Sequence, residues 1–128
     1  LSIEGKTRDI LVEIKIRKAA GKGAFQSIRK SKTDYAITNT AVTNENGNFR
    51  IAIGVRPGKA KLAHKAMELL NNSDNITDKV IDRACSFIDK ACSIITEEIT
   101  FGSNMRGSSE YRAAISKVMT KRAIKEVL

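Results

Sequence analysis

Hydrophobic and polar residues alternate along several stretches of the first half of the chain, which is the pattern of half-buried β-strands. The clearest pair is Tyr35–Thr43 and Phe49–Val55, where β-branched and aromatic residues recur at every second position. Between them, the sequence NENGN contains an Asn-Gly pair, which readily adopts the positive φ angles of a tight turn. We therefore expect these two strands to form an antiparallel hairpin.

Two further strands are predicted before the hairpin. In Asp9–Arg17, DILVEIKIR, isoleucine and valine occupy one face, and Leu11 is an apolar exception on the polar opposite face. That exception predicts that part of the polar face meets an apolar neighbour. After a loop with two glycines, Lys18–Gly23, the stretch Phe25–Lys30 is the second predicted strand. Residues 1–9 are interpreted as an irregular leader.

The period changes from two to about 3.6 after Arg56-Pro57-Gly58, a break that ends the predicted sheet. Apolar stripes then predict helices over Lys59–Asn71, from Thr77 as N-cap to Glu98, and from Ser108 to the end of the chain. The residues expected to be buried between sheet and helices are Ile51, Ile53, Leu62, Ile81, Ile88, Ile115 and Val118.

Strands followed by helices predict an α+β fold. We expect a small, mostly antiparallel sheet of three to four strands, followed by three helices packed on one face. The length of 128 residues fits a single domain, residues 1–128. Because the chain begins with Leu1 and not with methionine, we expect it to be part of a longer polypeptide.

The chain is basic, with 23 lysines and arginines against 14 acidic residues and a net charge of +9. This charge fits either a well-solvated surface or an anionic partner, such as nucleic acid or the phosphates of a cofactor. Aromatic residues on which bases could stack are few, at 5% of the chain, and this weighs against nucleic acid. No apolar run approaches the ~20 residues of a membrane span.

No catalytic constellation is visible in the sequence, and we predict no catalytic or metal-ligating residue. The single histidine, His64, and two cysteines cannot supply a histidine-based metal cluster or an iron–sulfur cluster. Cys85 and Cys92 are interpreted as thiols of a reducing compartment, because two helical turns are too far for a disulfide. Asp34 and Tyr35 fit either a functional site or a turn at a strand entry, and we favour the turn.

Four motifs in order resemble one known family. The segment GAFQSIRKSKTDYAITNTAV, with a basic cluster before Asp-aromatic-Ala and a strand, is the most specific. The others are ILVEIKI, FRIAIGVRPGKAKLAHKAMELL and the RGS-x-x-YR signature at Arg106–Arg112. Together they resemble the C-terminal domain of the FAD-binding subunit of molybdenum hydroxylases, such as xanthine, purine, nicotinate and carbon monoxide dehydrogenases.

The resemblance implies a fold and a role. The family's FAD subunit passes electrons from 2Fe–2S centres to FAD, after a molybdopterin-binding subunit oxidises the substrate in the cytoplasm. Its C-terminal domain closes over the flavin, whereas upstream domains supply most flavin contacts, so this chain alone is not expected to retain FAD. The resemblance places four residues as flavin-contacting candidates: Leu11, Gln26, Arg29 and Lys30. Gln26 replaces a lysine of some members, and Asn104 replaces an acidic residue that often precedes RGS.

Two function classes are therefore carried forward. The first is a flavoprotein domain of an oxidoreductase, partnered by upstream FAD-binding domains, a molybdopterin-binding subunit and a 2Fe–2S subunit, with neither nucleic acid nor a membrane span. The alternative is a basic, non-catalytic module that binds nucleic acid or an acidic protein.

Overall fold

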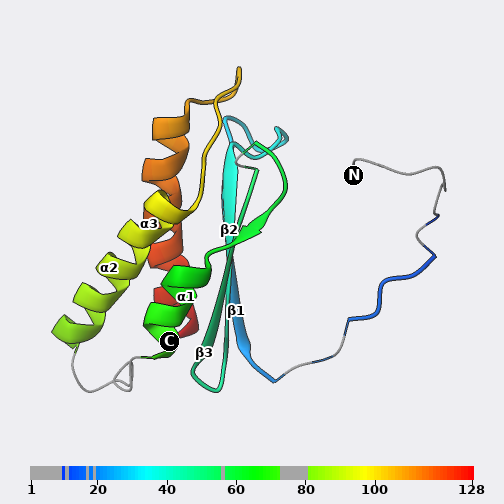
Figure 1. Ribbon diagram of the computed structural model, residues 1–128. Helices are drawn as coiled ribbons and strands as arrows, with labels where there is room; N and C mark the ends of the chain where they lie inside the picture. The colour runs from blue at the N-terminus through cyan, green and yellow to red at the C-terminus, as the bar shows by residue number, and fades with distance from the viewer. Residues whose placement is uncertain (1–9, 11, 17, 19, 56, 73–80) are drawn as a thin grey trace.

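The computed structural model describes residues 10, 12–16, 18, 20–55, 57–72 and 81–128, and within residues 81–85 it describes the backbone only. Four strands form one sheet in the order β1 (Lys22–Ile28), β2 (Thr38–Glu45), β3 (Asn48–Gly54) and β4 (Lys61–Leu62). Every neighbouring pair is antiparallel, so the chain forms a meander (Figure 1).

The hairpin between β2 and β3 forms where the Asn-Gly pair predicts it. Asn46 and Gly47 have φ angles of 52° and 85°, and the Gly47 amide donates to the Asn44 side chain at 2.9 Å. Glu45 pairs with Asn48, so the turn has two residues. Positive φ at both turn positions matches the right-handed twist of the flanking strands.

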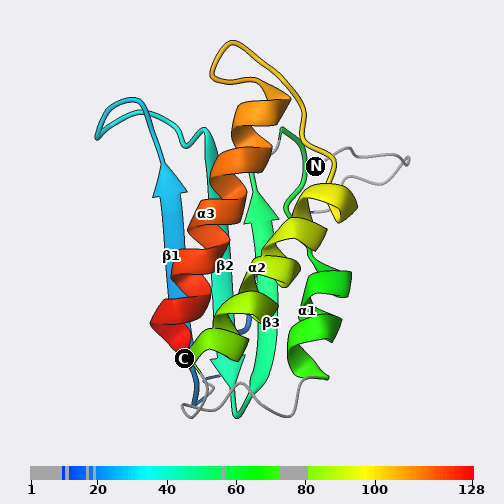
Figure 2. The same cartoon turned by 90° about the vertical axis from the view of Figure 1, so that its left-hand side faces the viewer.

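Three helices, α1 (His64–Asn71), α2 (Ile81–Glu98) and α3 (Ser109–Val127), all cover the same face of the sheet (Figure 2). The predicted α+β fold is therefore confirmed. The first helix begins later than predicted, because Lys61–Leu62 pairs with β3 as β4 before the chain turns into α1. The predicted N-cap of the second helix, Thr77, lies outside the described residues.

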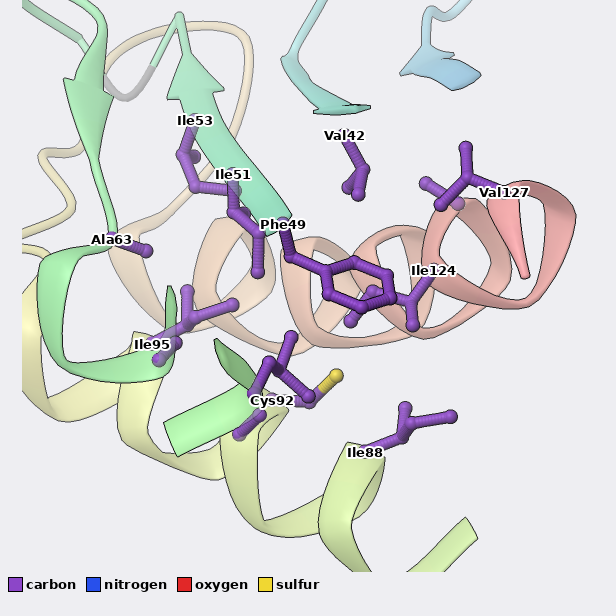
Figure 3. Packing of buried hydrophobic residues seen from close by; sticks show 14 of the residues in the cluster. Val42, Phe49, Ile51, Ile53, Ala63, Ile88, Cys92, Ile95, Ile124 and Val127 are labelled. Atoms are coloured by element: carbon purple, nitrogen blue, oxygen red, sulfur yellow. The ribbon is translucent and has the colours of Figure 1, made fainter. Parts of the chain in front are cut away.

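The hydrophobic core lies between the sheet and the helices. Alternate residues of β3 point into it, and aliphatic side chains of α2 and α3 meet them (Figure 3). Its largest members include Phe49, Ile51, Ile53, Leu70, Ile88, Ile95, Ile99 and Ile124. Of the residues predicted to be buried, Ile51, Ile53 and Ile88 are in this core. The prediction is wrong for Leu62, which is 38% exposed on β4, and the side chain of Ile81 lies outside the described residues.

The strand predicted at Asp9–Arg17 is wrong for the described residues. Ile10 and Val12–Ile16 form no strand, and their aliphatic side chains are 72–88% exposed. The alternating pattern predicts an extended segment with one apolar and one polar face. A strand of a sheet also needs a neighbouring strand with which it forms hydrogen bonds. Here the segment runs away from the sheet on the side opposite the helices (Figure 1). The fourth strand of the sheet is β4 instead.

The predicted buried face of the last helix is also wrong in part. Val118 is 42% exposed and Ile115 is only partly buried, whereas Arg112, Ser116 and Thr120 are fully buried. The Ser116 hydroxyl bonds to that of Thr38 on β2 at 3.1 Å, and Arg112 donates to the Ile37 carbonyl. Of the apolar stripe predicted for this helix, Met119 and Ala123 are buried, whereas Ile115 and Val118 are not.

Candidate functional site

The end of the sheet that follows β1 and β3 gathers the loops with the most chemically distinctive residues. The β1–β2 loop contains the basic run that begins at Arg29, and its turn closes where the Asp34 amide donates to the Ser31 carbonyl at 3.2 Å. The Asp34 carboxylate then accepts from the Tyr35 amide at 2.7 Å. The interpretation of Asp34 and Tyr35 as a strand-entry turn is thus confirmed.

A second loop, between α2 and α3, meets this turn. The guanidinium of Arg106 lies over the Tyr35 ring, 5.1 Å from its centroid, and its Nε is 3.9 Å from the Asp34 carboxylate. Tyr35 is nevertheless 77% exposed, and neighbouring Met105 is exposed as well. The pairing of residues 35 and 106 is a feature that no sequence spacing predicts.

Arg112 locks the same loops together from inside. Its fully buried guanidinium donates to the carbonyls of Ile37 and Val55, the latter at 2.8 Å, and to the Asn104 side-chain oxygen. Its Nε also donates to the Gly107 carbonyl at 3.3 Å. All of these acceptors are neutral, so no described carboxylate bonds to this buried cation. The last arginine of the RGS-x-x-YR signature is therefore a structural tie between three loops.

The rest of the signature also has a structural role. A Cβ on Gly107 would lie 3.1 Å from the Ile37 side chain, so the glycine permits close packing of the two loops. Ser108 caps α3 by accepting from the Tyr111 amide at 3.2 Å. The backbone amide of Glu110 and the Ser108 hydroxyl lower the pKa of the Glu110 carboxyl, which favours its charged form at the helix start.

Three of the four flavin-contacting candidates lie within the described residues. Arg29 and Lys30 are exposed after the end of β1, and neither forms an ion pair with a described residue. Gln26 lies on β1, an edge strand, but its side chain turns toward α3 and donates to Glu126 at 3.0 Å. Leu11 lies outside the described residues.

This arrangement can attract an anion. The described loops present exposed cations and an exposed aromatic ring. No cluster of three or more side chains able to hold a metal occurs in the part of the chain that the structure describes. The described helices also include none that could cross a membrane.

Comparison with known proteins decides the family. The family model described as the CO dehydrogenase flavoprotein C-terminal domain matches residues 23–127. The chain belongs to this family. The match begins within β1 and ends with α3, so it spans the sheet and all three helices but not the projecting Ile10–Ile16 segment.

Solved structures agree with this CO dehydrogenase flavoprotein fold. Quinoline 2-oxidoreductase from Pseudomonas putida 86 is 28% identical over 84% of the chain, with a TM-score of 0.66. The Cu,Mo-CO dehydrogenase in its cyanide-inactivated form covers 88% of the chain at 20% identity, with a TM-score of 0.68. Carbon monoxide dehydrogenase from Hydrogenophaga pseudoflava covers 87% at 21% identity and a TM-score of 0.67. The last two, at this identity, show the fold alone.

The chain spans 37–38% of the length of these three structures. No curated protein sequence matches it. The domain of the CO dehydrogenase flavoprotein family is therefore established, whereas the activity of the whole protein is a matter of proposal.

Proposed function

We propose that this chain is the C-terminal domain of the FAD-binding subunit of a molybdopterin-dependent oxidoreductase, of the xanthine dehydrogenase and carbon monoxide dehydrogenase type. The observation that carries the proposal is the family match over residues 23–127. The domain would close over the flavin while electrons pass from 2Fe–2S centres to FAD. Its partners would be the upstream FAD-binding domains, the molybdopterin-binding subunit and the 2Fe–2S subunit, in the cytoplasm.

The residues of this chain fit FAD as one wall of a shared site. Bound FAD supplies an isoalloxazine ring that accepts electrons, together with a pyrophosphate. Arg29 and Lys30 are exposed, and each can approach an anionic or hydrogen-bonding edge of such a ligand without breaking an ion pair to a described residue. Leu11, by the family resemblance, would supply an apolar contact to the ring.

Gln26 fits this role less directly than its position suggests. Its amide nitrogen already donates to Glu126, so the side chain can contact a ligand through its oxygen while this bond is kept. A role for Gln26 as a donor would require the bond to α3 to break. We therefore propose Gln26 as an acceptor or as a group that positions the edge of β1.

A charge-removal variant of the complete subunit tests this assignment. Replacing both Arg29 and Lys30 by alanine is expected to weaken FAD binding by about a hundredfold or more, because each charge-assisted hydrogen bond contributes ~1.5–3 kcal/mol when the bound ligand shields it from water. Lys90→Ala, an exposed lysine on the outer side of α2, is the matched control and should leave binding unchanged. Affinity is measured by quenching of flavin fluorescence at fixed ionic strength. Equal affinities for all three proteins would remove both residues as flavin contacts.

The alternative function is a basic binding module for nucleic acid or an acidic protein. The net charge of +9 favours it, but the described surface adds few exposed aromatic side chains for stacking. Salt-sensitive binding of single-stranded oligonucleotides to the isolated chain, lost in Arg29→Ala/Lys30→Ala, would support this class.

A further inference from the structure

The sheet has one uncovered face, and an apolar row crosses it. The strand register places Phe25 beside Ala41, Ala41 beside Ala52, and Ala52 beside Leu62. Directly paired residues lie on the same face of a sheet. Phe25 is 61% and Leu62 38% exposed, and both alanines are partly exposed. We call these four residues the central row.

The central row lies on the side away from the helices. Its neighbours along β3, Ile51 and Ile53, point into the core, and successive side chains of a strand alternate between faces. All three helices lie on the core side (Figure 2). The middle of the uncovered face is therefore formed by one large aromatic ring, one leucine and small alanines, which allow another layer to approach closely.

A second exposed apolar surface lies on the same side. The Ile10–Ile16 segment leaves β1 and runs on the side of the sheet opposite the helices (Figure 1). Ile10, Val12, Ile14 and Ile16 are each more than 70% exposed. Two unpartnered apolar surfaces on one side of a small domain mark an interaction site.

The size of the face limits what can cover it. β1, β2 and β3 are seven, eight and seven residues long, and β4 has only two residues. With strands ~4.8 Å apart and a rise of ~3.3 Å per residue, the face covers about 380 Å². A stable interface needs about 800 Å² per partner. The face alone falls short, so a stable complex must also use the exposed Ile10–Ile16 segment.

We propose that this uncovered face is the docking surface for the part of the same polypeptide that precedes Ile10. The chain spans 37–38% of the length of the flavoprotein-family structures that it matches, so most of such a protein lies outside it. The described part of the Ile10–Ile16 segment runs on the uncovered side of the sheet (Figure 1). A second copy is disfavoured, because the projecting segment of each copy would stand between the two faces. This docking proposal rests on the proposed function in one respect only, which is that the docked part of the polypeptide is identified as the FAD-binding domains.

Cysteine accessibility tests the proposal. Thr43, an exposed residue of the same face, is replaced by cysteine, and Lys90→Cys on the outer side of α2 is the control. Each variant is prepared as the 128-residue chain and as the complete subunit with its preceding polypeptide. Maleimide labelling is followed by peptide mass spectrometry, which separates the new cysteine from Cys85 and Cys92.

The expected result is protection that is specific to one face. Labelling at Thr43→Cys should be about tenfold slower or more in the complete subunit than in the isolated chain. The docked part must move away before the cysteine can react, and a free energy of ~1.4 kcal/mol for this separation already gives a factor of ten. Lys90→Cys should label equally fast in both. Ala52→Arg, which places a charge in the central row, should leave the isolated chain folded by circular dichroism but restore fast labelling at Thr43→Cys in the complete subunit.

Two outcomes would overturn the proposal. One is equally fast labelling of Thr43→Cys in both proteins. The other is protection of the isolated chain that increases with its concentration, which would assign the face to a second copy. The flavin content of the complete subunit is measured separately. If the complete subunit binds FAD but Thr43→Cys is not protected, the proposed function stands and the docking surface is rejected. If Thr43→Cys is protected but no FAD is bound, the docking surface stands and the proposed function is rejected.

Discussion

Arg112 brings a positive charge into the interior with only neutral oxygens around it. Desolvating a cation is costly unless most of its donors find partners, and here four of the five N–H groups donate to acceptors from three loops. One of these loops begins with Val55, directly after β3, and the φ of 53° at this residue is unusual for a β-branched side chain. The guanidinium therefore holds together the loops that position Tyr35 and Arg106.

Removing or compensating this charge should change stability in opposite directions. Arg112→Met is expected to lower the free energy of unfolding by about 2–4 kcal/mol, because it leaves buried carbonyls unpaired. Asn104→Asp should raise it by about 1 kcal/mol, because a carboxylate oxygen would replace the amide oxygen that accepts from Arg112. Urea denaturation measures both, and Arg122→Met on the exposed side of α3 is the control. Destabilisation by Asn104→Asp would show that the pocket does not accept a charge pair.

Cys92 is a second buried ionisable group. Burial raises the pKa of its thiol from the ordinary 9.0 to about 11, and the nearby Asp89 carboxylate acts in the same direction. Between pH 9 and 11 the unfolded chain loses this proton while the folded chain keeps it, so the free energy of unfolding falls as the pH rises through this range. Thiol reagents should not label Cys92 in the folded chain at pH 8.

The comparison variant is Cys92→Ala, which removes this titration. Its free energy of unfolding should depend less steeply on pH between 9 and 11 than that of the wild type. Other groups also titrate in this range, so the difference between the two curves is the quantity to measure. Parallel curves would mean that the thiol is not desolvated in the folded chain.

At the scale of elements, the β2–β3 hairpin and the order of strands and helices could be predicted from the sequence, because turn chemistry and periodicity are local. The absence of a strand at Asp9–Arg17 and the identity of the buried face of α3 could not be predicted in this way. A strand depends on a neighbour that the alternating pattern does not name. The buried face of α3 contains Arg112 and Ser116, which bond to a loop carbonyl and to a hydroxyl of β2, and it also contains Thr120, whose hydroxyl has no hydrogen-bond partner among the described residues.

The features of the candidate site likewise include some that follow from the local sequence and others that do not. The position of Arg29 and Lys30 after β1 follows from the local sequence, and the family motif directs attention to them. The contact of Arg106 with Tyr35 and the bond of Gln26 to Glu126 join residues 71 and 100 positions apart, respectively. Such contacts depend on the packing of whole helices against the sheet, and single-sequence patterns do not encode them.

The hairpin turn gives a direct test at this scale. Gly47→Ala is expected to lower the free energy of unfolding by about 1–2 kcal/mol, because alanine at a φ of 85° is strained. Gly23→Ala is the matched control: it is a strand glycine without positive φ, and an added Cβ would meet nothing closer than 3.8 Å. It should be neutral or slightly stabilising. Equal losses at both sites would indicate that positive φ is not what Gly47 supplies.

At the scale of the whole molecule, the chain is a one-layer sheet with helices on one side and an uncovered face on the other. The described residues contain no glycine-rich loop leading into a helix start, which is the usual cradle for a pyrophosphate. Its exposed lysines and arginines attract phosphates only weakly, because salt screens such charges over ~8 Å. We therefore propose that FAD binding is a property of the complete subunit, to which this domain would contribute one wall.

Flavin retention through gel filtration at moderate salt tests this central claim most directly. The isolated chain, mixed with excess FAD, should elute without absorbance at 450 nm, whereas the same chain joined to its preceding polypeptide should elute with about one FAD per subunit. An isolated chain that elutes yellow, or a complete subunit that loses its FAD, would contradict the assignment of this chain as the closing domain of a flavoprotein.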